Sequence, residues 1–205
     1  MNPAVLKNLS YGMYVIGTKY NGRPNACVAN SVIQISSSDP EKVLIALTKD
    51  THSCTAIREN GIFTISVLST DTPASVIGAL GLVSGKNADK LKNIRHKVLI
   101  EGVPVVKENT CCWFLCKVIS GMDVGQEMVF AAEIIAGSDS AIGTPMTYDF
   151  YRSEMHGLSP VGSPTYVPPE STFDKSSGES FVCSVCGYVS VSYTHLRAHE
   201  TAANL

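Results

Sequence analysis

Cysteines, hydroxyl groups and lysines are the side chains of this sequence whose types and spacing predict chemistry. Cys183 and Cys186 are separated by two residues, and two thiolates at that spacing can bind one metal ion. A tetrahedral site of four thiolates needs a second pair, and no second C-x-x-C follows. His195 and His199 suggest a zinc finger instead, but only eight residues separate Cys186 from His195, where that motif has about twelve. The zinc-finger interpretation is therefore set aside, and zinc bound by these residues would have no biological meaning.

A second candidate site consists of polar residues that could bind a phosphate group. Hydroxyl groups, a lysine and the backbone amides at a helix start provide the donors and the positive charge that a phosphate needs. They occur in two stretches, Asn25–Ser31 and Thr48–Ser53. A solvated turn has the same composition, so both interpretations stay open on these residues alone. Gly81–Asn87 is similar to a P-loop, but it is one residue short, lacks the Mg²⁺-binding hydroxyl and follows a predicted helix.

The overall composition limits the function classes. Of 205 residues, 44% are hydrophobic, and 16 basic against 18 acidic residues leave a net charge of −2. This balance excludes a basic surface large enough for nucleic acid, and the apolar runs are too short to span a bilayer. Seven cysteines, an odd number, and no export signal argue against a disulfide framework. We expect a cytoplasmic protein with no nucleic-acid or membrane partner.

Short strands dominate the first 150 residues of the sequence. Two or three short helices are expected. One covers Ser53–Asn60, with the polar cluster Thr51–Ser53 as its cap and Gly61 after its end, and one covers Pro73–Leu82, with a capping residue in Asp71-Thr72-Pro73. At least six strands with few helices predict a mainly β fold, a closed or nearly closed barrel. The expected strands are Gly12–Thr18, Cys27–Ile35, Val43–Leu47, Ile62–Leu68, Cys112–Ile119 and Met128–Ile135.

Several motifs occur in an order that points to a known family. They are Leu9–Thr18, Asn25–Ser36, Thr48–Ser53, Gly61–Leu68, Ser84–Lys90, Asp123–Gly125 with Phe130–Glu133, and Met146–Tyr151. Together they resemble the flavin reductase-like, FMN-binding split-barrel family over residues 1 to about 155. The resemblance implies a six-stranded antiparallel Greek-key split barrel, FMN as cofactor, NAD(P)H as electron donor, and a homodimer with FMN at the subunit interface.

The resemblance also implies which residues contact the cofactor. One position departs from the family, because Glu127 stands where a histidine often lies near the flavin or the nicotinamide. This departure concerns the reaction with nicotinamide rather than flavin binding, and no catalytic acid or base is assigned. The expected cofactor contacts are Asn25, Cys27, Ala29, Asn30 and Ser31 along the ring and ribityl chain, Lys49, Thr51, His52 and Ser53 at the phosphate, and Ser84, Gly85 and Lys86 in a segment that closes over the cofactor.

The composition changes after the predicted barrel. Residues 156–180 are rich in proline, glycine, serine and threonine, which predicts a linker. Phe181–Tyr188 then resembles the first metal-binding knuckle of a rubredoxin. This order is similar to the high-molecular-weight rubredoxin subgroup, in which a flavin reductase domain precedes a rubredoxin. We therefore interpret residues 1–155 as the barrel and 181–190 as the first half of a rubredoxin-like domain, whose Cys183 and Cys186 bind iron only in the full-length protein.

The last residues carry a different signal. Val191–Thr201 resembles the conceptual translation of a transposase adapter used to prepare sequencing libraries. Residues 191–205 are interpreted as adapter-derived and are excluded from functional reasoning.

Two functions follow from these observations. In the first, an electron-transfer flavoprotein takes a hydride from NAD(P)H onto FMN and passes electrons to a rubredoxin iron centre or a flavodiiron-type acceptor. In the second, the protein binds FMN without reductase turnover, a function that the glutamate at position 127 favours.

Overall fold

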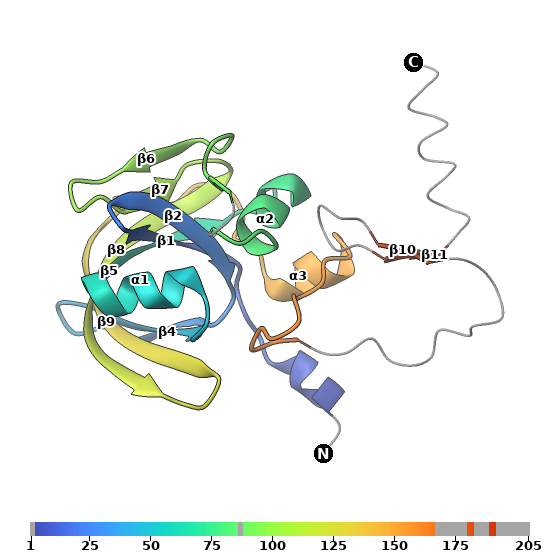
Figure 1. Ribbon diagram of the computed structural model, residues 1–205, viewed down its shortest axis with the longest axis horizontal. Helices are drawn as coiled ribbons and strands as arrows, with labels where there is room; N and C mark the ends of the chain where they lie inside the picture. Colours follow the sequence, from blue (N-terminus) through green and yellow to red (C-terminus); the bar gives the residue numbers. More distant parts are fainter. Residues whose placement is uncertain (1–2, 86–87, 167–179, 183–188, 192–205) are drawn as a thin grey trace.

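A seven-stranded antiparallel sheet forms the body of the protein (Figure 1). The computed structural model describes residues 3–85, 88–166, 180–182 and 189–191. The strand order is β2-β1-β5-β8-β9-β4-β3. The strands are β1 (Tyr14–Tyr20), β2 (Arg23–Ala29), β3 (Val32–Ser36), β4 (Lys42–Thr48), β5 (Ile62–Leu68), β8 (Thr110–Asp123) and β9 (Glu127–Gly137).

The connection between β2 and β3 closes this sheet into a barrel. The two strands lie at opposite edges of the sheet, yet only Asn30 and Ser31 separate them in the chain. The expected single strand Cys27–Ile35 is therefore wrong as one straight element, since its mixed burial pattern reflects a bend from one edge to the other. Counted as one bent strand, β2 and β3 complete the expected six-stranded split barrel. Asn21 and Gly22 form the tight turn between β1 and β2, with φ of 48° and 75°.

The two expected helices are present. Helix α1 (His52–Asn60) begins at Thr51, whose side chain accepts a hydrogen bond from the Cys54 amide, and ends at Gly61 in the left-handed conformation. Helix α2 (Ala74–Gly81) begins at Pro73 without any side-chain cap, so the cap expected before the proline is wrong. The Thr72 hydroxyl donates instead to the Asn109 carbonyl, 2.8 Å away.

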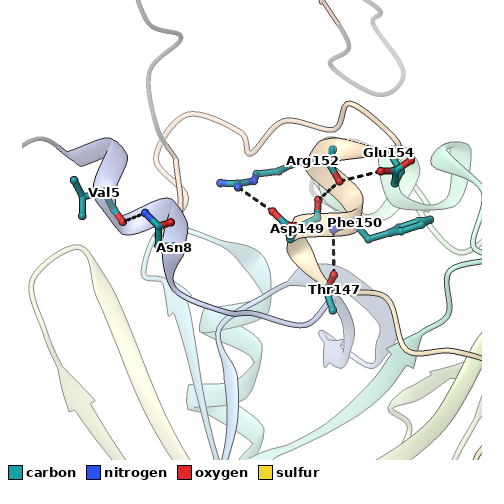
Figure 2. Close-up of polar contacts among 8 residues, drawn as sticks. Val5, Asn8, Thr147, Asp149, Phe150, Arg152 and Glu154 are labelled. Atoms are coloured by element: carbon teal, nitrogen blue, oxygen red, sulfur yellow. Dashed lines mark hydrogen bonds and ion pairs between the residues drawn. The ribbon is translucent and has the colours of Figure 1, made fainter.

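Several short elements were not expected from the sequence. They are the 3₁₀ helix η1 (Pro3–Asn8), strands β6 (His96–Val98) and β7 (Pro104–Val106), and helix α3 (Tyr148–Ser153). Figure 2 shows the polar contacts of α3: the Thr147 hydroxyl accepts from the Phe150 amide, and Arg152 pairs with Asp149. Strands β10 (Ser180–Val182) and β11 (Val189–Val191) pair with each other and flank the segment that holds Cys183 and Cys186.

Two hydrophobic clusters hold these elements together. One fills the barrel, with Ile16, Ile45 and Phe63 among its buried side chains. The other includes Met13, Leu68 and Ile77 and joins the barrel to α2 and α3, which lie on the same side of it in Figure 1. Within the described residues, no helix is both long enough and apolar enough to cross a membrane.

Candidate functional site

A cavity of about 330 Å³ lies where the barrel, α2 and α3 meet. This volume is within the range of about 300–1,000 Å³ that small-molecule sites have. Its walls are mostly apolar, with a few polar side chains at the strand ends. The cavity is lined by Met13, by Cys27–Asn30 and Ala46–Thr48 at the ends of β2 and β4, by Thr51, by Ile77, Gly81 and Leu82 of α2, by Tyr148 and Tyr151 of α3, and by Leu158–Thr165.

The break between β2 and β3 places Asn30 at this cavity. The Ala46 amide of β4 donates to the Ser31 carbonyl at 3.0 Å, which ties the bend to the sheet. The Ser31 hydroxyl donates to Asn30 Oδ1 at 3.2 Å, and Asn30 Nδ2 donates to Thr165 Oγ1 at 2.7 Å. The Asn30 amide is therefore held in a fixed orientation at the rim.

The start of α1 lies beside the same cavity. The Thr51 hydroxyl donates to the Thr48 carbonyl at 2.7 Å and accepts from the Cys54 amide at 3.2 Å. Among the described residues, nothing accepts a hydrogen bond from the backbone amides of His52 and Ser53. Two free N–H groups at the positive end of a helix are suited to a phosphate.

Lys49 and His52 have other contacts and do not line the cavity. Lys49 Nζ donates to Asp123 Oδ2 at 2.6 Å, and this hydrogen bond holds the pKa of the Asp123 carboxyl below its ordinary value. The His52 ring lies 4.3 Å from the Tyr20 ring, centroid to centroid. The phosphate contacts of these two side chains remain predictions.

Cys27 lies between the cavity and the start of α1. Burial raises the pKa of its thiol, while the Ser53 hydroxyl and the Lys90 ammonium act in the opposite direction. Burial also lowers the pKa of Lys90. Cys27 is therefore a neutral thiol in the cavity wall at neutral pH rather than a thiolate nucleophile.

The segment after α2 packs against β2. A Cβ on Gly85 would lie 2.5 Å from Asn25 Oδ1, so the Asn25 side chain would have to move if position 85 carried a side chain. Ser84 belongs to the same segment, whereas Lys86, Cys183 and Cys186 lie outside the described residues. Within the part of the chain that is described, no three metal-ligating side chains cluster.

The structure thus brings Cys27, Ala29, Asn30 and Thr51 to one cavity and adds residues that the sequence reasoning missed. These are Thr48, the α2 residues and Leu158–Thr165, part of the predicted linker. Ser159, Ser163 and Thr165 lie among prolines in the sequence, and this composition does not distinguish a linker from a segment that has partners.

Residues 6–159 match the family model described as the flavin reductase like domain. The chain belongs to the flavin reductase-like family. It is 31% identical over 190 residues to the "High molecular weight rubredoxin" of Moorella thermoacetica, covering 92% of this chain and 82% of that protein. It is 28% identical over 166 residues to the "Ferric-chelate reductase (NAD(P)H)" of Archaeoglobus fulgidus, covering 81% of this chain and 98% of the relative.

Solved structures agree with this family. The flavoredoxin of Methanosarcina acetivorans matches with a TM-score of 0.59 at 22% identity, over 66% of this chain and 74% of that one. This confirms the expected fold, a mainly antiparallel β split barrel with few helices. As a member of this family, the chain belongs to the general class of flavin-dependent oxidoreductases.

The cavity of this flavin reductase-like chain fits a flavin. Its apolar walls suit the ring system, and the two free amides at the start of α1 suit a phosphate. The buried Ser163 hydroxyl, which has no hydrogen-bond partner in the described part of the chain, provides one further polar group for a ligand.

Proposed function

We propose that this protein binds FMN in the cavity, takes electrons from NAD(P)H and passes them to a rubredoxin-type iron centre. The observation that carries the proposal is the apolar cavity that reaches Thr51, which directly precedes the free amides of His52 and Ser53. An aromatic ring system with a phosphate at one end matches this distribution of apolar and polar groups.

The residues of the chain would bind and orient the cofactor. Val28 and Leu47 provide apolar surface that excludes water from the ring. Asn30 offers an oriented amide, and the start of α1 offers donors for the phosphate. FMN, when bound, supplies the conversion between two-electron transfer from nicotinamide and one-electron transfer to iron.

The acceptor is proposed from the relative named high molecular weight rubredoxin, which matches 92% of this chain. Cys183 and Cys186 would supply two of the four thiolates that such an iron site requires.

We also propose that two copies of the chain associate. Strand β3 lies at a sheet edge and leaves Ile33 and Ile35 exposed, and Met122 and Ile135 are exposed on β8 and β9. Exposed apolar side chains on several strands of one sheet are the kind of surface that an interface covers. Size-exclusion chromatography with light scattering should give twice the mass of one chain, and a monomer that binds one FMN would contradict the proposal.

Steady-state kinetics tests the reaction. The FMN-loaded chain should oxidise NADH or NADPH, and the rate should increase when a separately purified rubredoxin is added as acceptor. The second candidate, FMN binding without turnover, is favoured by Glu127, which pairs with the cavity residue Thr48 across β4 and β9. A chain that retains FMN but oxidises neither nicotinamide would support that alternative and contradict the reductase.

A further inference from the structure

The segment Leu158–Thr165, named the strap below, follows α3 and forms one wall of the cavity. Four hydrogen bonds attach it to the rest of the protein. The Tyr148 and Tyr151 hydroxyls meet Ser159 Oγ and the Leu158 carbonyl, and thereby join the strap to α3. At its other end, Asn30 Nδ2 donates to Thr165 Oγ1 at 2.7 Å, and Thr48 Oγ1 donates to the Gly162 carbonyl at 3.1 Å.

These contacts distinguish the strap from a solvated linker. Asn30 and Thr48 lie at the ends of β2 and β4, so the strap is attached to the two strand ends that form the opposite wall of the cavity. Pro160 and Pro164 restrict its backbone, which lowers the entropy lost when it is held in one conformation.

One polar atom of the strap lacks a partner. The Ser163 hydroxyl is buried and makes no hydrogen bond to any of the described residues, although its residue lines the cavity. Leaving a buried hydroxyl unpaired is unfavourable, and native structures contain few such groups. The backbone of the same residue is fully engaged, since its amide donates to the Pro160 carbonyl and its carbonyl accepts from the Tyr166 amide.

We propose that the strap is a ligand-binding element of the flavin site, and that the Ser163 hydroxyl hydrogen-bonds the ring or ribityl part of a bound flavin. This inference rests on the proposed function and extends the site beyond residue 159, where the match to the family ends. The ring or ribityl part is chosen because the cavity that the strap lines is mostly apolar, with residues such as Val28 and Leu47 in its walls.

The decisive variant is Ser163→Ala, which removes the hydroxyl and leaves the strap attached. Loss of one hydrogen bond should raise the dissociation constants of FMN and riboflavin alike, by about three- to tenfold. The flavin-free variant should be at least as stable to heat as the parent, because the removed hydroxyl had no partner. A residue with a merely structural role would instead lower the thermal stability without this selective loss of affinity.

Two further variants complete the experiment. Thr165→Val removes the acceptor of the Asn30 amide, so FMN should dissociate faster and iodide should quench the fluorescence of the bound flavin more strongly. Ser37→Ala, at an exposed serine in the β3–β4 connection, is the matched control and should change none of these values.

The outcomes separate the two proposals. If the parent binds flavin and Ser163→Ala binds FMN and riboflavin equally well, the assignment of the strap is wrong while the proposed function stands. A loss of affinity for FMN alone would place Ser163 at the phosphate and would contradict the ring contact. A parent that binds neither FMN nor riboflavin would overturn the proposed function and the strap assignment together.

Discussion

Two threonines cap helices in the same way, and only one of them lies at the cavity. Thr51 begins α1 with φ of −84° and ψ of 147°, and Thr147 begins α3 with φ of −87° and ψ of 156°. Each side chain accepts a hydrogen bond from the amide three residues later, at 3.2 Å for Cys54 and 3.1 Å for Phe150. Thr51 lines the cavity, whereas Thr147 does not.

Replacing either threonine by alanine should destabilise the flavin-free chain to a similar extent. Loss of a threonine cap typically costs about 1 kcal/mol, and for a chain of this size that lowers the melting temperature by about 2–4 °C. The effects on FMN should differ. Thr51→Ala also removes the hydrogen bond to the Thr48 carbonyl and loosens the helix start whose amides are proposed to hold the phosphate. A loss of about 1–2 kcal/mol there would raise the FMN dissociation constant roughly five- to thirtyfold.

Circular dichroism melts of the flavin-free variants and fluorescence titrations with FMN measure both quantities. Thr147→Ala should melt earlier and bind FMN as the parent does, and Thr51→Ser should restore both properties because it keeps the hydroxyl. If Thr51→Ala and Thr147→Ala bind FMN with the same affinity, the start of α1 is not the phosphate site and this reasoning is refuted.

Three further predictions concern other parts of the chain. Glu127→His should increase the rate of NAD(P)H oxidation at saturating FMN, measured as the loss of nicotinamide absorbance. The variant restores the residue type common in the family and removes a negative charge beside Thr48. An unchanged rate would contradict a role for this position. Gly17→Ala should lower the free energy of unfolding in urea by roughly 1–3 kcal/mol. The Cβ of the new alanine would lie 2.0 Å from the Pro104 carbonyl oxygen, so the backbone would have to move. An unfolding midpoint equal to that of the parent would contradict this prediction. Burial raises the pKa of the Cys116 thiol from 9.0 to about 12, so the folded state binds this proton more tightly than the unfolded state does. The protein should therefore lose stability as the pH rises from 9 towards 12. Cys116→Ala should make this loss smaller in melts recorded across that pH range.

The elements that the sequence predicted correctly have strong local signals. Strand β5 carries a run of β-branched and aromatic residues, and its expected bounds Ile62–Leu68 are those observed. Helix α1 has a threonine before its first turn and Gly61 after its last, and both have the expected roles. The barrel could be inferred because at least six short segments rich in apolar and β-branched residues, among them β1, β4 and β9, occur with few helices between them.

The elements that were missed depend on distant contacts. Strands β6 and β7 have three residues each, and β7 is stable as a strand because Val105 and Val106 are fully buried against the barrel. Helix α3 spans six residues and is held by Tyr148 and Tyr151 in the cluster that joins it to the barrel. No pattern within segments this short distinguishes them from loops.

The strap was missed for a different reason. Its proline, glycine and serine content is typical of a linker, and nothing in that composition reports that Asn30 and Thr48 bond to it. These partners precede the strap by more than one hundred residues in the chain. The composition of a segment indicates how much conformational entropy is lost when the segment is ordered. The tertiary fold determines which partners form the contacts that offset this loss.

The polar stretch Thr48–Ser53 also shows that composition does not identify the partner of each side chain. Thr48 and Lys49 are adjacent, yet Thr48 donates to the strap at the cavity while Lys49 pairs with Asp123 at the end of β8. Lys49 pairs with a residue that lies 74 positions away in the sequence. The residues of the stretch alone therefore could not predict that Thr48 and Lys49 have different partners. Because the charge of Lys49 is balanced by Asp123, we expect a phosphate bound at this point to depend on the free amides that begin α1.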